Sequence, residues 1–258
     1  MKFFHKLTVG LAALFVFIAV TPAQADADVG SVIDGQLVLG KRVFALPPGR
    51  WIVVNSAEST VGLIESGARG ASTKSQYLVQ VDAENRFIAA VNIRTTLAST
   101  HVSYWNDTTC DRKDTLFWDK LDGNFKFPAC LLVNYSTNFW KGVPDNEYDK
   151  KIWSWYQEKK LTMPSTAVST AYIKFFAGDF VRATYWFNPE LAGIPVDGAS
   201  VRSQSAWNSE LLKSNPERQR YIESVKSWSA SLIAANRASL YDGKPNIASL
   251  PALPGLAR

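Results

Sequence analysis

The chain has 258 residues and a formal net charge of +5, and its lysines and arginines are dispersed rather than clustered. A nucleic-acid-binding protein is expected to carry a clustered basic face, so this charge pattern argues against that class. Apolar residues make up 47% of the chain, which is enough for a buried core and excludes a largely disordered protein.

Residues 1–25 have the layout of a secretory signal peptide. Two lysines give a positive start, the stretch 7–20 is apolar, and small residues precede the expected cleavage point after Ala25. The apolar stretch is shorter than the roughly 20 residues that cross a bilayer as a helix. We therefore predict an exported, soluble protein, periplasmic or extracellular, whose mature chain begins at Asp26 and has no transmembrane span.

The segment 35–55 contains two apolar runs that flank the sequence PPGR. Pro48 and Gly49 suit the two central positions of a tight turn, so we expect a pair of short strands joined across it. A clearer hairpin follows, with strands predicted at 76–82 and 86–96. Both are rich in β-branched and aromatic residues, and a short polar connection separates them.

Only two cysteines are present, Cys110 and Cys130, and both follow the predicted signal peptide. In an oxidising compartment such a pair usually forms a disulfide, so we predict a bridge between them. Buried free thiols are the alternative, and the spacing is not that of a C-x-x-C redox centre. Around the bridge, strands are predicted at 115–121 and 129–136.

The sequence YDKKIWSWYQEKK, residues 148–160, belongs to a predicted helix that begins near residue 146 and is capped by Asp145. Trp153 lies to one side of the apolar face of this helix. Four residues share that face by their three- and four-residue spacing, which predicts a buried stripe: Tyr148, Ile152, Trp155 and Tyr156.

The third hairpin has strands predicted at 165–177 and 180–187, around the turn signal of Gly178 and Asp179. Residues of the second strand alternate between apolar and more polar types, so one face should be buried and the other wetter. The more polar face is available for a functional site, and it carries three residues: Arg182, Thr184 and Trp186.

A long helix is predicted from Pro216, with Asn215 as its N-cap and one apolar stripe along its length. We therefore predict an α+β fold, in which antiparallel β hairpins form a sheet packed by a mid-chain helix and a long C-terminal helix. Residues 26–245 are expected to form a single domain. Residues 246–258 form an extended C-terminal tail that lies along the domain or is free.

Aromatic side chains are the main candidates for a ligand-binding site. Phe139 and Trp140 precede the mid-chain helix by a few residues, and with Trp153 they can form an exposed aromatic shelf. Trp186, on the wetter strand face, is a fourth candidate. Such a shelf suits a sugar, a lipid or a peptide, and the alternative is that these rings belong to the core.

Catalytic chemistry has less support in the sequence. His101 is the only histidine after the signal peptide, and no G-x-S-x-G motif accompanies it. No cofactor or metal site is indicated, and a zinc site with several histidines is excluded by their number. We therefore predict a noncatalytic binding or accessory module of the cell envelope or exterior, whose partner is a small molecule, a glycan, a lipid or an envelope protein.

Two alternatives to a binding module remain open. The first is a secreted hydrolase that uses carboxylates and His101. Glu58, Glu65 and Asp179 are all eligible carboxylates, because their separation in space is not readable from the sequence. The second alternative is a component of a larger assembly, which would display a broad apolar patch.

Overall fold

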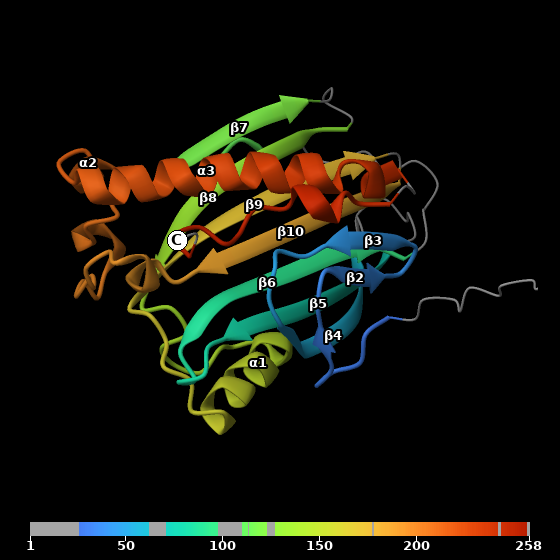
Figure 1. Ribbon diagram of the computed structural model, residues 1–258, viewed down its shortest axis with the longest axis horizontal. Helices are drawn as coiled ribbons and strands as arrows, with labels where there is room; N and C mark the ends of the chain where they lie inside the picture. Colours follow the sequence, from blue (N-terminus) through green and yellow to red (C-terminus); the bar gives the residue numbers. More distant parts are fainter. Residues whose placement is uncertain are drawn as a thin grey trace, which may run out of the picture.

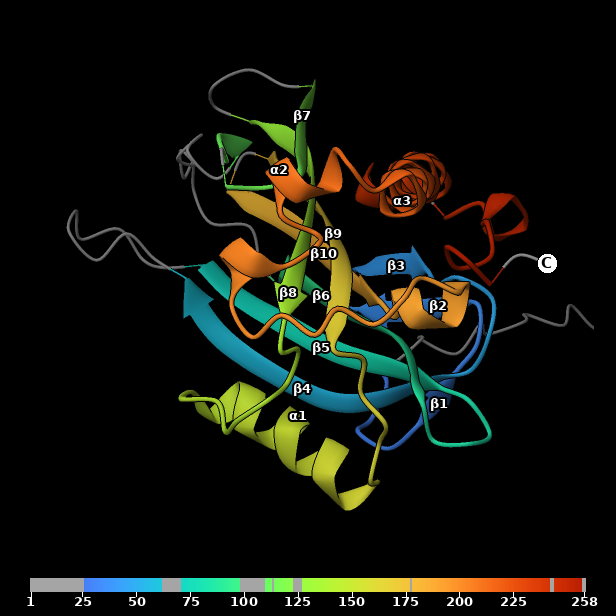
Figure 2. The same ribbon diagram turned by 90° about the vertical axis from the view of Figure 1, so that its left-hand side faces the viewer.

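The computed structural model describes residues 26–61, 71–97, 110–112, 114–122, 127–176, 178–241 and 244–256. The predicted α+β fold is confirmed. An eight-stranded antiparallel sheet carries helix α1 (Glu147–Glu158) on one face and the long helix α3 (Pro216–Asn236) on the other (Figures 1 and 2).

Two antiparallel meanders make up the sheet. One is β4–β5–β6, with β1 added at its outer edge, and the other is β7–β8–β9–β10. They join side by side through β6 and β10, so strands from distant parts of the chain meet at the centre of the sheet (Figure 1). The bounds, in sheet order, are β1 (Val32–Ile33), β4 (Trp51–Val61), β5 (Ala71–Val81), β6 (Phe87–Thr96), β10 (Asp179–Phe187), β9 (Thr166–Phe176), β8 (Ala129–Thr137) and β7 (Phe117–Asp122).

The prediction of two strands joined across the PPGR sequence is wrong. The first apolar run itself folds into a hairpin of β2 (Gln36–Leu39) and β3 (Arg42–Ala45), which forms a separate two-stranded sheet. Gly40 makes this possible because it takes a φ of +59° in the turn, a conformation that glycine adopts without steric cost. The PPGR segment then connects β3 to β4, which do not pair with each other.

The later hairpins are close to the prediction. The strands predicted at 76–82 and 86–96 correspond to β5 and β6, and those at 165–177 and 180–187 correspond to β9 and β10. Asp179 differs from the prediction, because it pairs with Phe176 as the first residue of β10 instead of lying in the turn.

Both main helices begin with an asparagine cap. In α1 the cap is Asn146 rather than the predicted Asp145, and its side chain accepts a hydrogen bond from the Asp149 amide. In α3 the predicted Asn215 cap is confirmed. No helix within the described ranges is long and apolar enough to cross a membrane. The shorter helical segments are η3 (Pro189–Ala192), η4 (Arg202–Gln204), α2 (Ser209–Leu212), η5 (Ala238–Tyr241) and η6 (Ile247–Ser249).

The sheet separates two buried clusters of side chains. On the α3 side, Trp228 packs its ring against Tyr185 and Phe187 of β10, with ring centroids 5.1 and 5.0 Å away. Leu253, near the C-terminus, is buried in the same cluster, so this part of the tail lies along the body. On the opposite face, Ile152 of α1 is buried in the second cluster.

The predicted disulfide is confirmed, with the Sγ atoms of Cys110 and Cys130 bonded to each other. Both residues are buried in a third cluster, which also contains Phe180 of β10. The bridge therefore attaches the segment before β7 to the α1 face of the sheet, near the start of β8.

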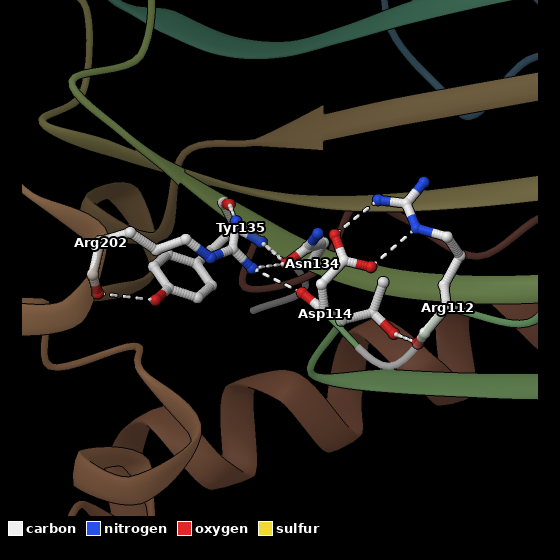
Figure 3. A network of polar contacts seen from close by, with 6 residues as sticks. Arg112, Asp114, Asn134, Tyr135 and Arg202 are labelled. Carbon is white, nitrogen blue, oxygen red and sulfur yellow. Dashed lines mark hydrogen bonds and ion pairs between the residues drawn. The ribbon is translucent and has the colours of Figure 1, made fainter.

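A polar network attaches η4 to β8 and to the segment before β7 (Figure 3). The Arg202 guanidinium lies over the Tyr135 ring at 4.3 Å, donates to the Tyr135 carbonyl and contacts Asn134 Oδ1. It also donates to the Asp114 carbonyl, while the Asp114 carboxylate forms a two-fold ion pair with Arg112 at 2.7 Å. This ion pair lowers the pKa of Asp114 to about 2.

Candidate ligand-binding cleft

A cleft of about 580 Å³ opens on the α1 face of the sheet. Side chains from β4, β5, β6 and β10 form its floor, and the turn before α1 and the first turn of that helix form a wall. Its volume lies within the range of about 300–1,000 Å³ that is typical of small-molecule sites.

Strand β10 supplies one side of this cleft, because its side chains alternate between the two faces of the sheet. Val181, Ala183 and Tyr185 are buried in the core on the α3 side, and the residues between them lie on the other face. Arg182 is exposed there and Trp186 is half-buried. The face that the sequence predicts to be wetter therefore lines the cleft.

Aromatic rings form one end of the cleft. The Trp186 ring lies 5.7 Å from Tyr77 and 6.5 Å from Phe139, measured between ring centroids. Trp140 completes the group with edge-to-face contacts to Tyr77 at 6.1 Å and to Phe139 at 5.7 Å. These rings hold one another in place, and both indoles keep part of their surface exposed. We call these four residues and Tyr148 the aromatic wall.

Trp140 has an unusual backbone conformation. Its φ is +57°, a left-handed value that is an outlier for a bulky residue. Asn138, two residues earlier, also has a positive φ and is tied down by a hydrogen bond from its amide to the Ser165 carbonyl at 2.9 Å. Strained backbone of this kind is concentrated at functional sites. Here it brings the indole to 5.4 Å from the Tyr156 ring, measured between centroids.

Below the aromatic wall, two tyrosine hydroxyls are buried together. Tyr77 Oη and Tyr156 Oη lie 3.0 Å apart and share a hydrogen bond. Burial raises the pKa of both phenols well above the ordinary value, so both are neutral. The pair joins α1 to the floor of the cleft.

Two arginines form the opposite, polar end of the cleft. Arg94 of β6 and Arg182 of β10 are direct partners in the strand register. Arg94 donates to Ser59 Oγ at 2.8 Å and to Thr73 Oγ1, and Arg182 Nε donates to a neighbouring threonine hydroxyl at 3.3 Å. Desolvation lowers the pKa of both arginines, and for Arg182 the nearby charges of Arg112 and Arg94 lower it further.

Acidic residues also line the cleft, but they contact other groups. Glu58 lies 3.6 Å from Lys74 Nζ, and Asp149 accepts a hydrogen bond from Asn146 Nδ2 at 2.8 Å in the first turn of α1. Tyr148, which also lines the cleft, donates to Asn92 Oδ1 at 3.4 Å. Burial, and then the charge of Asp149, raises the pKa of Tyr148.

The structure brings together three of the four residues proposed as ligand contacts. Phe139, Trp140 and Trp186 all line the cleft, although Phe139 is buried instead of exposed on a shelf. Trp153 is half-buried on α1 and is not part of the lining. Phe139 and Trp140 therefore belong to the wall of a cleft, and the exposed shelf that we expected them to form with Trp153 is not present.

Sequence reasoning missed Tyr77 and Arg94 as lining residues and assigned Tyr148 to the buried stripe of α1. Arg182 had a usable signal, since it alternates with apolar residues on a predicted strand. Arg94 had none, because the two strands that place it beside Arg182 are far apart in the chain.

The carboxylates considered for hydrolysis are separated. Asp179 is bound by Arg42 in a buried two-fold ion pair, at 2.7 and 3.1 Å, and does not line the cleft. Glu58 does line it, while Glu65 and His101 lie outside the described residues. Within the described ranges, no group of three or more His, Cys, Asp or Glu side chains is placed to hold a metal ion.

A second hollow of about 630 Å³ lies between α3 and strands β7 to β9. Lys226, at its edge, is paired with Glu223 at 2.9 Å and lies over the Phe117 ring. Aliphatic residues such as Leu131 and Ile233 line much of it. Of these two hollows, the cleft on the α1 face is the stronger candidate, because its described lining contains several mutually packed rings and two opposed arginines.

Comparison with known proteins adds no assignment. No family model matches the chain, and no match is found among curated proteins or among solved structures. The cleft and its side chains are therefore the basis for a functional proposal.

Proposed function

We propose that this is an exported, noncatalytic binding protein whose cleft holds the apolar face of a small ligand against Trp140 and Trp186. The observation that carries the proposal is the aromatic wall, in which neighbouring rings fix both indoles before any ligand arrives. Aromatic surfaces offer a large contact area at a low entropy cost, and a wall already in place avoids the cost of ordering it. A sugar ring, an acyl chain or an aromatic group fits such a wall.

Export is part of the proposal. The Cys110–Cys130 disulfide is typical of an oxidising compartment, and residues 1–25 have the pattern of a signal peptide. Asp26 already belongs to the folded domain, because its carboxylate accepts hydrogen bonds from Lys74 Nζ at 2.7 Å and from the Gly40 amide at 2.9 Å, so the proposed cleavage after residue 25 leaves these contacts in place. Mass spectrometry of the natural protein should find a mature chain that begins at Asp26, and an intact N-terminus at residue 1 would contradict export.

Binding can be tested with N-phenyl-1-naphthylamine, a neutral probe whose fluorescence rises in an apolar site. We expect saturable binding to the protein, weakened about tenfold by Trp140→Ala and by Trp186→Ala, since each removes a ring contact and its buried area. Trp153→Ala is the matched control, because it removes an indole of similar exposure that does not line the cleft. Circular dichroism confirms that each variant is folded.

Two results would overturn the proposal. The first is the absence of saturable probe binding to the folded wild-type protein. The second is equal binding by the Trp140, Trp186 and Trp153 variants, which would place the probe outside the cleft.

A further inference from the structure

We propose that the ligand of this cleft carries an anionic group at one end, which binds between the guanidinium groups of Arg94 and Arg182. This inference rests on the proposed binding function and adds the chemical class of the ligand: an amphipathic carboxylate, sulfate or phosphate. The apolar part of the ligand lies on the aromatic wall, and the anionic group lies at the polar end.

The strand register carries the first part of the inference. Arg182 is the direct partner of Arg94 across β10 and β6, and both side chains line the cleft. Directly opposed residues in an antiparallel pair have Cβ atoms about 4.5–5.5 Å apart, and like charges in this position destabilise the sheet. An anion bound between them removes that repulsion.

Among described side chains, Arg94 and Arg182 lack the counter-ions that three other arginines of the protein have. Arg42, Arg86 and Arg112 each form an ion pair with an aspartate at 2.6 to 2.7 Å. Within the described part of the chain, no carboxylate lies at ion-pair distance from Arg94 or Arg182. The charge of these two residues is therefore not neutralised by described side chains.

Both arginines also have guanidinium N–H donors that are not bonded to any described residue. Ser59 and Thr73 hold the Arg94 guanidinium through Nε and Nη2, and Thr184 holds Arg182 through Nε alone. Among the described residues, no acceptor is bonded to Nη1 of Arg94 or to either terminal nitrogen of Arg182. Guanidinium groups presented in this way match the oxygens of a carboxylate, sulfate or phosphate.

Acidic residues limit how much negative charge the ligand carries. Glu58 and Asp149 line the same cleft, so a ligand with negative charge along its whole length would be repelled. A single anionic end, with an apolar or neutral remainder, satisfies both the arginines and the aromatic wall.

A matched pair of probes separates the anionic contribution from the apolar one. 8-Anilino-1-naphthalenesulfonate has the ring system of N-phenyl-1-naphthylamine with one added sulfonate. Arg182→Gln should weaken sulfonate binding about tenfold and leave the neutral probe within about twofold, because it removes only charge-assisted hydrogen bonds. Arg220→Gln, at an exposed position on α3, should change neither affinity.

Competition identifies the kind of anion. Benzoate and hexyl phosphate should displace the sulfonated probe more strongly than sodium chloride at the same ionic strength. The better of the two competitors distinguishes a carboxylate ligand from a phosphate ester. Stronger displacement by hexyl phosphate than by inorganic phosphate supports an amphipathic ligand over a free ion.

The possible failures can be told apart. If Arg182→Gln leaves the affinity for both probes unchanged, or weakens both affinities equally, the inference of an anionic group is wrong. The proposed function still stands in that case, provided that binding of the neutral probe depends on Trp140. If chloride competes as well as the organic anions, the inference is also wrong. If neither probe binds the wild-type protein, the proposed function fails and the inference fails with it.

Discussion

Arg94 and Arg182 lie directly opposite each other at the seam between the two meanders of the sheet. One comes from the last strand of the first meander and the other from the last strand of the second. The protein therefore places two positive charges side by side at the centre of its sheet, at the other end of the cleft from the aromatic wall. This arrangement has consequences for stability as well as for binding.

Arg182→Gln should stabilise the empty protein. The substitution removes the repulsion between opposed charges, so the free energy of unfolding at low salt should rise by up to about 1 kcal/mol. The gain should shrink near 1 M sodium chloride, where the Debye length is about 3 Å. Urea unfolding at both salt concentrations measures the effect. Arg220→Gln serves as the control, and a loss of stability in the Arg182 variant at low salt would contradict the prediction.

Trp140 offers a test of backbone strain. Alanine and glycine at this position both remove the indole, but only glycine adopts a φ of +57° without strain. We expect Trp140→Gly to be more stable than Trp140→Ala by about 1 kcal/mol in urea unfolding. Equal stability of the two variants would show that the turn relaxes to another conformation when the indole is lost.

The buried hydroxyl pair should show strong coupling. Tyr156→Phe leaves the Tyr77 hydroxyl buried without its partner, which costs about 1–3 kcal/mol of unfolding free energy. The double variant with Tyr77→Phe removes both polar groups, so its loss should be smaller than the sum of the two single losses. A double-mutant cycle by urea unfolding measures this coupling, and strictly additive losses would argue against the bond.

The ion pair of Asp179 should make the free energy of unfolding depend on pH in the acid range. Burial alone would raise its pKa, but the hydrogen bonds and charge of Arg42, with Lys41 nearby, lower it below the ordinary value. The ion pair therefore stabilises the protein above the unfolded pKa of about 3.9, and this contribution is lost as the pH falls through the lower folded pKa.

Asp179→Asn tests this pH dependence. The variant should be less stable than wild type at pH 7 by about 3–5 kcal/mol, because Arg42 is left buried without its partner. The difference should begin to narrow below about pH 4, where Asp179 of the unfolded wild type takes up a proton, and should narrow further as the pH falls through the lower folded pKa. Glu210→Gln, which breaks the exposed pair with Lys213, should cost less than about 1 kcal/mol. A constant difference from pH 7 to pH 2 would contradict the assignment.

The disulfide should stabilise the fold. Replacing Cys110 and Cys130 together by alanine should lower the free energy of unfolding by about 3 kcal/mol, chiefly because the unfolded chain gains freedom. A thiol reductant should lower the stability of wild type towards that of the double variant and leave the variant unchanged. Equal stability of oxidised wild type and double variant would show that the bridge contributes little.

The sequence by itself determined the local parts of this protein. The helix α3, its Asn215 cap and its apolar stripe were all readable, because capping and helical periodicity involve residues a few positions apart. The hairpins β5–β6 and β9–β10 were readable for the same reason, and two cysteines allow only one pairing. The β2–β3 hairpin was not predicted, because its turn residue Gly40 lies inside an apolar run.

Only the tertiary structure decided the candidate site. Trp140 and Trp186 meet in the cleft, whereas Trp153 is left outside it, because the docking of α1 on the sheet selects which rings face the floor. Arg94 and Arg182 become partners because β6 and β10 lie side by side. That neighbour relationship depends on how two meanders join, and contacts between strands so distant in the chain leave no periodic signal in either strand.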